Sequence, residues 1–203
     1  IYFSRYYWAL SQDQLWYFSP VNLCAAATAL YLARRLSASY DKQTVAIRLW
    51  IFAAIFLPVP VLLRLPGWFP PTGSDLMLYL LLAHSFIEIC VMTIASILIA
   101  SMMADLAEDS ETITGRRSEG LFFSALSFSA KATTGLGVVT AGMILEFVEF
   151  PLGASFGEVP ANIMTEFALI ALGAICAFYL LATMALRYYR ITRASHSQNL
   201  AIL

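Results

Sequence analysis

The sequence predicts an all-α membrane protein, a polytopic bundle of transmembrane helices. Two observations predict this class. The 203 residues are 60% hydrophobic and only 12% charged, and their mean hydropathy is +0.75; a soluble domain has about half apolar and a quarter charged residues. The apolar surplus also lies in long runs instead of being spread along the chain, as membrane-spanning helices require.

Five apolar runs reach the length of about 20 residues that one crossing of a bilayer needs. Pro58 and Pro60 fall in the second run, and we expect them to kink or end its outer segment because proline has no N–H. The chain starts without Met or a signal peptide, which predicts a piece of a longer protein. The expected elements are a truncated helix end at 1–10, spans at about 15–36, 44–63, 76–104, 121–146 and 162–186, and a polar tail at 187–203.

Basic residues distinguish the two sides of the predicted membrane. Nine lie in or beside the charged connections and the tail, and two lie on the opposite side, where the connections are rich in Pro and Gly. This bias predicts that the charged connections and the C-terminus are cytoplasmic. The nine are Arg34, Arg35, Lys42, Arg48, Arg116, Arg117, Arg187, Arg190 and Arg193, and the two are Arg5 and Arg64.

Composition and motifs argue against several other classes. The net charge of −1 and the lack of a basic stripe predict no nucleic-acid partner. Cys24, Cys90 and Cys176 lie in separate apolar runs without a CxxC pair, so we interpret them as small buried side chains. The sequence has no HExxH, no GxSxG and no metal-ligand cluster. It therefore predicts no enzyme, no metal site and no cofactor apart from a coupling ion.

Ionisable residues inside the apolar runs are the strongest functional signal. Lys131 lies ten residues, or about 15 Å, into its run, near the middle of a hydrocarbon core about 30 Å thick. His84 and Glu88 share one helical face. Because a charge at this depth is costly, we predict a solute or ion pathway that includes these three residues and Asn22. Three alternatives stay open: a structural Lys131–Glu88 pair, a His84 bond to a neighbouring helix, and an Asn22 bond to a carbonyl freed by Pro20.

Small residues recur on the fourth run, where they predict close packing against another helix. A nucleotide-binding glycine loop is disfavoured because no strand precedes these residues and no GK[ST] follows them. The predicted packing residues are Thr133, Gly135, Gly137 and Ala141.

The segment ADLAEDSETITGRRSEGLFFSALSFSAK, residues 104–131, carries a family resemblance. It resembles a signature of the glycoside–pentoside–hexuronide:cation symporters, the branch of the major facilitator superfamily that includes the melibiose permease. The family's Thr-Gly-Arg-Arg-Ser-Glu-Gly is intact at 114–120, before the eleventh helix. The family's acidic Asp-Tyr-Gly-Glu patch is Glu-Asp-Ser-Glu here, at 108–111, and Ile113 replaces a frequent basic residue. Weaker resemblance covers nearly the whole chain.

The resemblance implies the C-terminal six-helix half of a major facilitator fold, with its first helix truncated. The whole protein would couple movement of a sugar or similar small solute to Na⁺ or H⁺ by alternating access, in the bacterial inner (plasma) membrane. Its partners would be the lipid bilayer, the solute and the missing N-terminal six-helix half, which holds most sugar- and cation-binding carboxylates of the family. Lys131 falls where the family places an intramembrane lysine close to both sites.

The charged connection before the fourth run is predicted to form the cytoplasmic gate through ion pairs. The alternative is a solvated loop, whose exposed pairs contribute only about 0–1 kcal/mol each. Other functions that stay open are a non-transporting membrane module for binding or assembly and a lysolipid-type transporter of the same family. The predicted gate residues are Asp105, Glu108, Asp109, Glu111, Arg116, Arg117 and Glu119.

Overall fold

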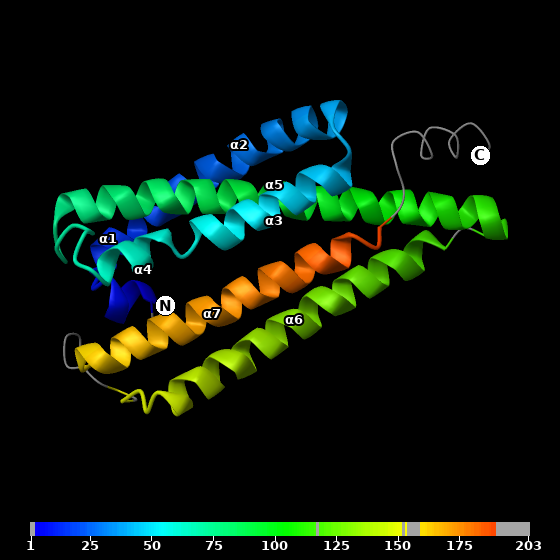
Figure 1. Cartoon of the computed structure of the whole chain (residues 1–203). Coiled ribbons are helices and arrows are strands. Elements are labelled where there is room, and N and C mark those ends of the chain that lie inside the picture. The colour runs from blue at the N-terminus through cyan, green and yellow to red at the C-terminus, as the bar shows by residue number, and fades with distance from the viewer. Residues whose placement is uncertain (1–2, 117, 152, 154–158, 190–203) are drawn as a thin grey trace.

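The computed structural model is a bundle of long helices (Figure 1). It describes residues 3–116, 118–151, 153 and 159–189. Within them, five helical segments are long and apolar enough to cross a membrane, which confirms the predicted fold class. These segments are Gln12–Ser39, Lys42–Arg64, Asp75–Thr114, Glu119–Phe147 and Ala161–Leu186.

The chain enters the bundle through two short elements. The π-helical turn η1 (Phe3–Tyr7) precedes α1 (Gln12–Trp16). A capping box starts α1: the Ser11 hydroxyl accepts from the Gln14 N–H, and the Gln14 side chain accepts from the Ser11 N–H. The following helix α2 (Phe18–Ser39) continues this first span.

The second span consists of α3 (Lys42–Phe56) and α4 (Val59–Arg64). Leu57 and Pro58 join them and keep right-handed helical dihedrals, with φ of −56° and −74°. The second span therefore stays right-handed through the break at Pro58. Such proline breaks are common in membrane helices, where the freed carbonyls find other donors.

The two prolines of this span free two carbonyl groups for neighbouring helices. Pro58 and Pro60 have no N–H, so the carbonyls four residues earlier, of Ala54 and Phe56, lack their usual helical donors. The Cys176 thiol lies 3.5 Å from the Ala54 carbonyl oxygen, and a ring nitrogen of a histidine on α5 lies 3.2 Å from the Phe56 carbonyl oxygen. The two carbonyls freed by the prolines thus make two contacts between helices.

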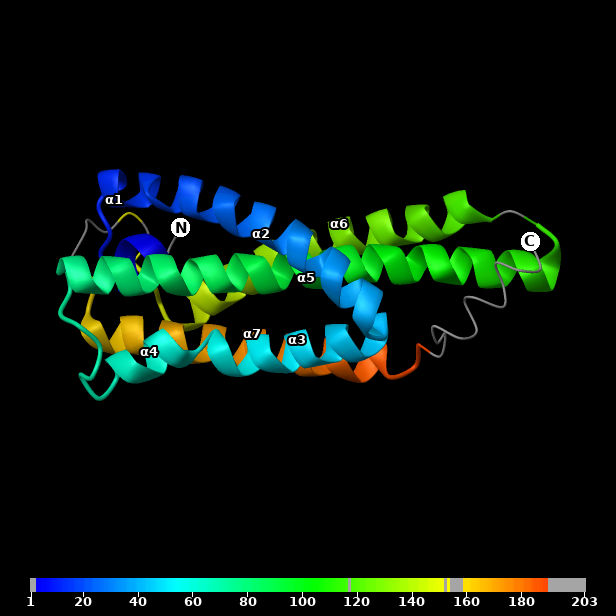
Figure 2. The same cartoon turned by 90° about the horizontal axis from the view of Figure 1, so that it is seen from above.

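Helix α5 (Asp75–Thr114) is 40 residues long and extends beyond the ends of α2, α3 and α7 (Figures 1 and 2). The charge pattern predicts a loop from residue 105 onwards, and this prediction is wrong. Charge does not stop a helix: residues 105–114 contain neither Gly nor Pro, and Glu, Leu and Ala favour helix. The helix ends at Gly115, whose left-handed φ of 65° favours glycine.

Helix α6 (Glu119–Phe147) lies at the edge of the bundle and has no buried side chain, whereas α7 (Ala161–Leu186) packs against α3 (Figure 1). The small residues predicted to pack are all exposed. No atom lies within 4 Å of a Cβ built on Gly135 or Gly137. Within the described part of this chain, therefore, the stripe Thr133, Gly135, Gly137 and Ala141 is exposed, and its packing against another helix stays a prediction.

A different row of small residues packs closely instead. Ala25, Ala29 and Ala33 recur every four residues on α2 and are at most 2% exposed. They lie where α2 meets α5, and there the Cys90 thiol donates to the Ala25 carbonyl oxygen at 3.1 Å. Small side chains let these two backbones approach, which is how helices associate in a membrane.

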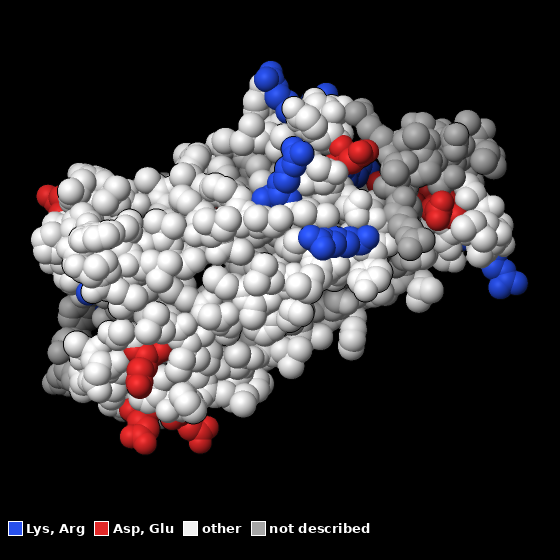
Figure 3. Space-filling model, in the orientation of Figure 1, with Lys and Arg blue, Asp and Glu red and all other residues white. Residues whose placement is uncertain are grey.

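Charged side chains lie toward the two ends of the face that Figure 3 shows. Lys and Arg gather over the half where α2 is joined to α3, and acidic side chains dominate the opposite end. A surface without charged side chains lies between them, as a bilayer core requires.

Candidate solute and ion pathway

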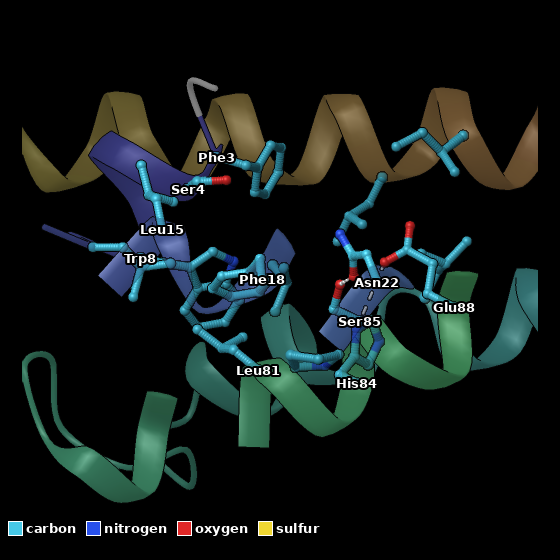
Figure 4. A pocket seen from close by; sticks show the side chains of 16 residues that line it. Phe3, Ser4, Trp8, Leu15, Phe18, Asn22, Leu81, His84, Ser85 and Glu88 are labelled. Atoms are coloured by element: carbon cyan, nitrogen blue, oxygen red, sulfur yellow. Dashed lines mark hydrogen bonds and ion pairs between the residues drawn. The ribbon is translucent and has the colours of Figure 1, made fainter. Parts of the chain in front are cut away.

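A cavity of about 460 Å³ lies among η1, α1, α2, α4, α5 and α7 (Figure 4). Its volume falls in the range of small-molecule sites, about 300–1,000 Å³. Most of its lining is apolar, and a few polar groups converge on it, which is typical of such sites. The polar lining residues are Ser4, Asn22, His84, Ser85 and Glu88.

Asn22 is held by a hydrogen bond between helices. The Ser85 hydroxyl on α5 donates to the Asn22 side-chain oxygen on α2 at 2.9 Å (Figure 4). Because this oxygen accepts from Ser85, the Asn22 NH₂ group is the part that can donate to a solute. The alternative partner for Asn22, a carbonyl freed by Pro20, is not the contact found. Sequence reasoning missed Ser85, whose position directly after His84 on one predicted span was the available signal.

His84 and Glu88 line the same cavity one helical turn apart. The His84 Nδ1 atom lies 3.9 Å from the Glu88 Oε2 atom, and the His84 Nε2 atom lies 3.2 Å from the Phe56 carbonyl oxygen. The imidazole also stacks on the Phe56 ring, with centroids 4.6 Å apart and planes 10° apart. Phe56 therefore sets both the position and the orientation of His84. In the sequence, the signal for this contact is Pro60, because a proline leaves the carbonyl four residues earlier, that of Phe56, without its helical donor.

Lys131 lies on α6 and is exposed, away from the residues that line the cavity. It forms no ion pair with the residues that the structure describes. The Lys131–Glu88 pair left open by the sequence is not formed among the described residues, and the polar side chain that faces Glu88 is His84. A role of Lys131 in the pathway stays a prediction.

A second polar cluster lies where α5 leaves the bundle. The Lys42 ammonium, on the first residue of α3, contacts both carboxylate oxygens of Asp105 at 2.7 Å. The Tyr189 hydroxyl donates to the same carboxylate at 3.1 Å. Asp105 is buried, so these contacts offset the cost of removing its charge from water. Sequence reasoning counted Lys42 as a loop cation and missed it as the partner of Asp105.

The next residue of α3 joins the end of α7 to this cluster. The Gln43 amide nitrogen donates to the carbonyl oxygens of Leu186 and Tyr189, each at 2.7 Å. The last carbonyls of a helix lack partners inside the helix, so Gln43 satisfies groups that need a donor. Lys42 and Gln43 together connect α3 to the ends of α5 and α7.

The other predicted gate residues follow along the same end. Glu108, Asp109 and Glu111 lie on the last turns of α5, Arg116 follows Gly115, and Glu119 is the first residue of α6. Arg117 lies outside the described residues.

Tyr189 is expected to stabilise this cluster through its hydroxyl. Burial and the nearby charges of Asp105 and Asp109 raise the pKa of Tyr189 above its usual range. A raised pKa keeps the phenol protonated, so its contribution is present below about pH 10 and is lost as the pH rises through the raised pKa. We expect Tyr189→Phe to lower the free energy of unfolding by about 1 kcal/mol. Denaturation should show the same loss at about pH 7 and about pH 9; a loss confined to one of them would contradict this assignment.

The fold and the cavity define a multi-pass helical membrane protein with a polar site between its spans. Residues 1–193 match the family of MFS/sugar transport proteins, and the chain belongs to this family. An uncharacterized symporter of Synechocystis sp. is 30% identical over 135 residues. This match covers 64% of the chain and 24% of the relative, so the matched part spans about a quarter of the relative's length. No solved structure matches the chain.

Proposed function

We propose that this chain is part of a secondary active transporter of the glycoside–pentoside–hexuronide:cation symporter type. It moves a sugar or similar small solute together with Na⁺ or H⁺ by alternating access, and it is not an enzyme. The observation that carries this proposal is the cavity between the spans, which presents Asn22, His84 and Glu88 together. Ionisable groups at this depth of a membrane protein are typical of transport pathways.

The cavity suits a small polar solute with hydroxyl groups. A sugar hydroxyl both donates and accepts hydrogen bonds; the Glu88 carboxylate accepts, and the Asn22 NH₂ group donates. Trp8 and Phe18 line the same cavity and offer aromatic surfaces to the apolar face of a sugar ring. The symporter of Synechocystis sp. supports coupling to an ion.

A second six-helix half completes the proposed transporter. Alternating access needs two halves that move against each other about a site near the middle of the membrane. The exposed α6, with Lys131 and the small-residue stripe, offers a face for that half to contact. This proposal places Lys131 at the boundary of the two halves, on the path that the solute takes between them.

The end where α5 extends is the proposed cytoplasmic gate, in a bacterial inner membrane with the C-terminus inside. The basic residues gathered near this end support the orientation. The Lys42–Asp105 pair ties α3 to α5 there, so this part of the gate moves as one unit. The gate comprises Asp105, Glu108, Asp109, Glu111, Arg116, Arg117 and Glu119.

Uptake into liposomes tests the function. The full-length protein that carries this chain is reconstituted, and a panel of radiolabelled mono- and disaccharides is offered under a Na⁺ gradient or a pH gradient. We expect at least one sugar to accumulate above equilibrium under one gradient and to leak out when an ionophore dissipates it. Saturable binding without accumulation would instead identify a non-transporting binding module.

A further inference from the structure

We propose that His84 and Glu88 form a site for one proton, and that the coupling ion is H⁺. This inference rests on the proposed transport function and assigns its ion. It is carried by the hydrogen-bond geometry around His84, which Pro60 sets.

Pro60 determines which nitrogen of His84 carries a hydrogen. Because Pro60 has no N–H, the Phe56 carbonyl oxygen is free to accept a bond from another helix. His84 Nε2 lies 3.2 Å from this oxygen. A carbonyl oxygen can only accept, so Nε2 must be the donor. In the neutral ring, Nδ1 is then a bare acceptor, and it faces Glu88.

One proton is the number that this geometry accommodates. Without it, the Nδ1 lone pair and the Glu88 carboxylate are two acceptors facing each other, and neither satisfies the other. With one proton they become donor and acceptor, as a carboxylic acid with an imidazole or as an imidazolium with a carboxylate. A second proton would give an imidazolium beside a neutral carboxylic acid, and the pair would then carry a net positive charge, which is costly inside a membrane. The present separation of 3.9 Å exceeds a hydrogen bond of about 2.7–3.2 Å, so proton binding draws the two side chains together.

The surroundings favour this pair as the place where charge changes. Among the lining residues, His84 and Glu88 are the titratable ones. On the helices around them, Cys90, Cys176 and Tyr179 each donate to a neighbour other than His84 or Glu88. The Asn22 oxygen is occupied by the Ser85 hydroxyl, which leaves few oxygen ligands for a metal cation beside Glu88.

Proton binding changes the charge of the pair, so the crossing between the two access states can depend on the ion. The empty pair has the charge of the Glu88 carboxylate, and the loaded pair is neutral. A net charge near the middle of a membrane is costly, so the loaded state crosses between the two access states more easily. The proton binds from one side and leaves unchanged on the other.

Infrared difference spectroscopy of the full-length protein in lipid nanodiscs measures the proton site directly. Spectra are recorded from about pH 4 to about pH 9, which spans the usual range of both groups. The Glu88 carboxyl band is the one that Glu88→Gln removes. We expect this band to titrate in the wild-type protein, and His84→Gln to move its midpoint by about ten-fold or more in proton affinity.

Pro60→Ala is expected to move the titration midpoint of Glu88 to lower pH, with about ten-fold weaker proton binding. The new N–H at position 60 takes the Phe56 carbonyl into the helix, so protonated His84 loses an acceptor. The freed ring can also present Nδ1–H to the Glu88 carboxylate, which stabilises the empty pair. Pro58→Ala is the matched control. The carbonyl that Pro58 leaves without a helical donor is that of Ala54, which contacts Cys176 and not His84.

Three results would overturn the inference: a Glu88 band that does not titrate, equal shifts in the two proline variants, or sugar accumulation driven by a Na⁺ gradient but not by a pH gradient. The last result leaves the transporter assignment standing and removes H⁺ as its ion. Conversely, a Glu88 band that titrates as expected, without accumulation of any sugar under either gradient, overturns the proposed function and leaves the proton site in place.

Discussion

Replacing Lys42 with Met is expected to lower the free energy of unfolding by about 3 kcal/mol, the size typical of breaking a buried ion pair. The Asp105 side chain is only 7% exposed and Lys42 is 21% exposed, so water cannot replace the lost ammonium well. The Tyr189 hydroxyl, which also donates to Asp105, is neutral. Denaturation of the full-length protein in detergent measures the loss.

Two further variants make this prediction specific. The double change Lys42→Met with Asp105→Leu should recover most of the stability, because it removes the buried carboxylate together with the ammonium that pairs with it. Arg48→Met on the same helix removes an exposed cation and should stay within about 0.5 kcal/mol of the wild type. Equal losses of unfolding free energy for Lys42→Met and Arg48→Met would show that the Lys42–Asp105 contact stabilises the protein no more than an exposed cation does.

Lys131→Ala is expected to reduce solute uptake by about 100-fold, the upper range for one charged hydrogen bond. The proposed position of Lys131 is on the solute path between the two halves, where its ammonium contacts passing solute hydroxyls or carboxylates of the second half. The same change should leave the stability of this half unaltered, because Lys131 is exposed and makes no ion pair within the described residues. Initial rates of sugar uptake in liposomes and denaturation in detergent measure the two effects.

The comparison of Lys131→Arg with Lys131→Met separates charge from shape. Arg keeps the cation and should retain more uptake than Met, which keeps only the length of the side chain. If uptake persists unchanged in Lys131→Ala, the assignment of Lys131 to the pathway is wrong.

Hydropathy predicted the spans well and misjudged where one helix stops. The apolar run ends near Asp105, but α5 continues to Thr114. A membrane boundary is a change of solvent, whereas a helix end needs a residue such as Gly115 that leaves the helical conformation. In the outer connections after α4 and α6 and before α5 and α7, the two boundaries nearly coincide, because Pro and Gly occur there.

Spacing alone could not say which small residues pack. Ala25, Ala29 and Ala33 on α2 have the same four-residue period as Thr133, Gly137 and Ala141 on α6. The first row meets α5 and the second meets no helix of the described chain. A period reveals that a helix has a small-residue face, but the neighbour that covers that face is a property of the tertiary structure.

The sequence by itself determined the class of the protein, the five spans, and the placement of His84 and Glu88 on one face of one helix. Only the tertiary structure decided which partners the polar side chains have: Phe56 for His84, Ser85 for Asn22 and Lys42 for Asp105. The physical reason is that hydropathy and helical period act along one helix. These contacts join residues 28 to 63 positions apart, and their register depends on how α2, α3 and α5 pack together.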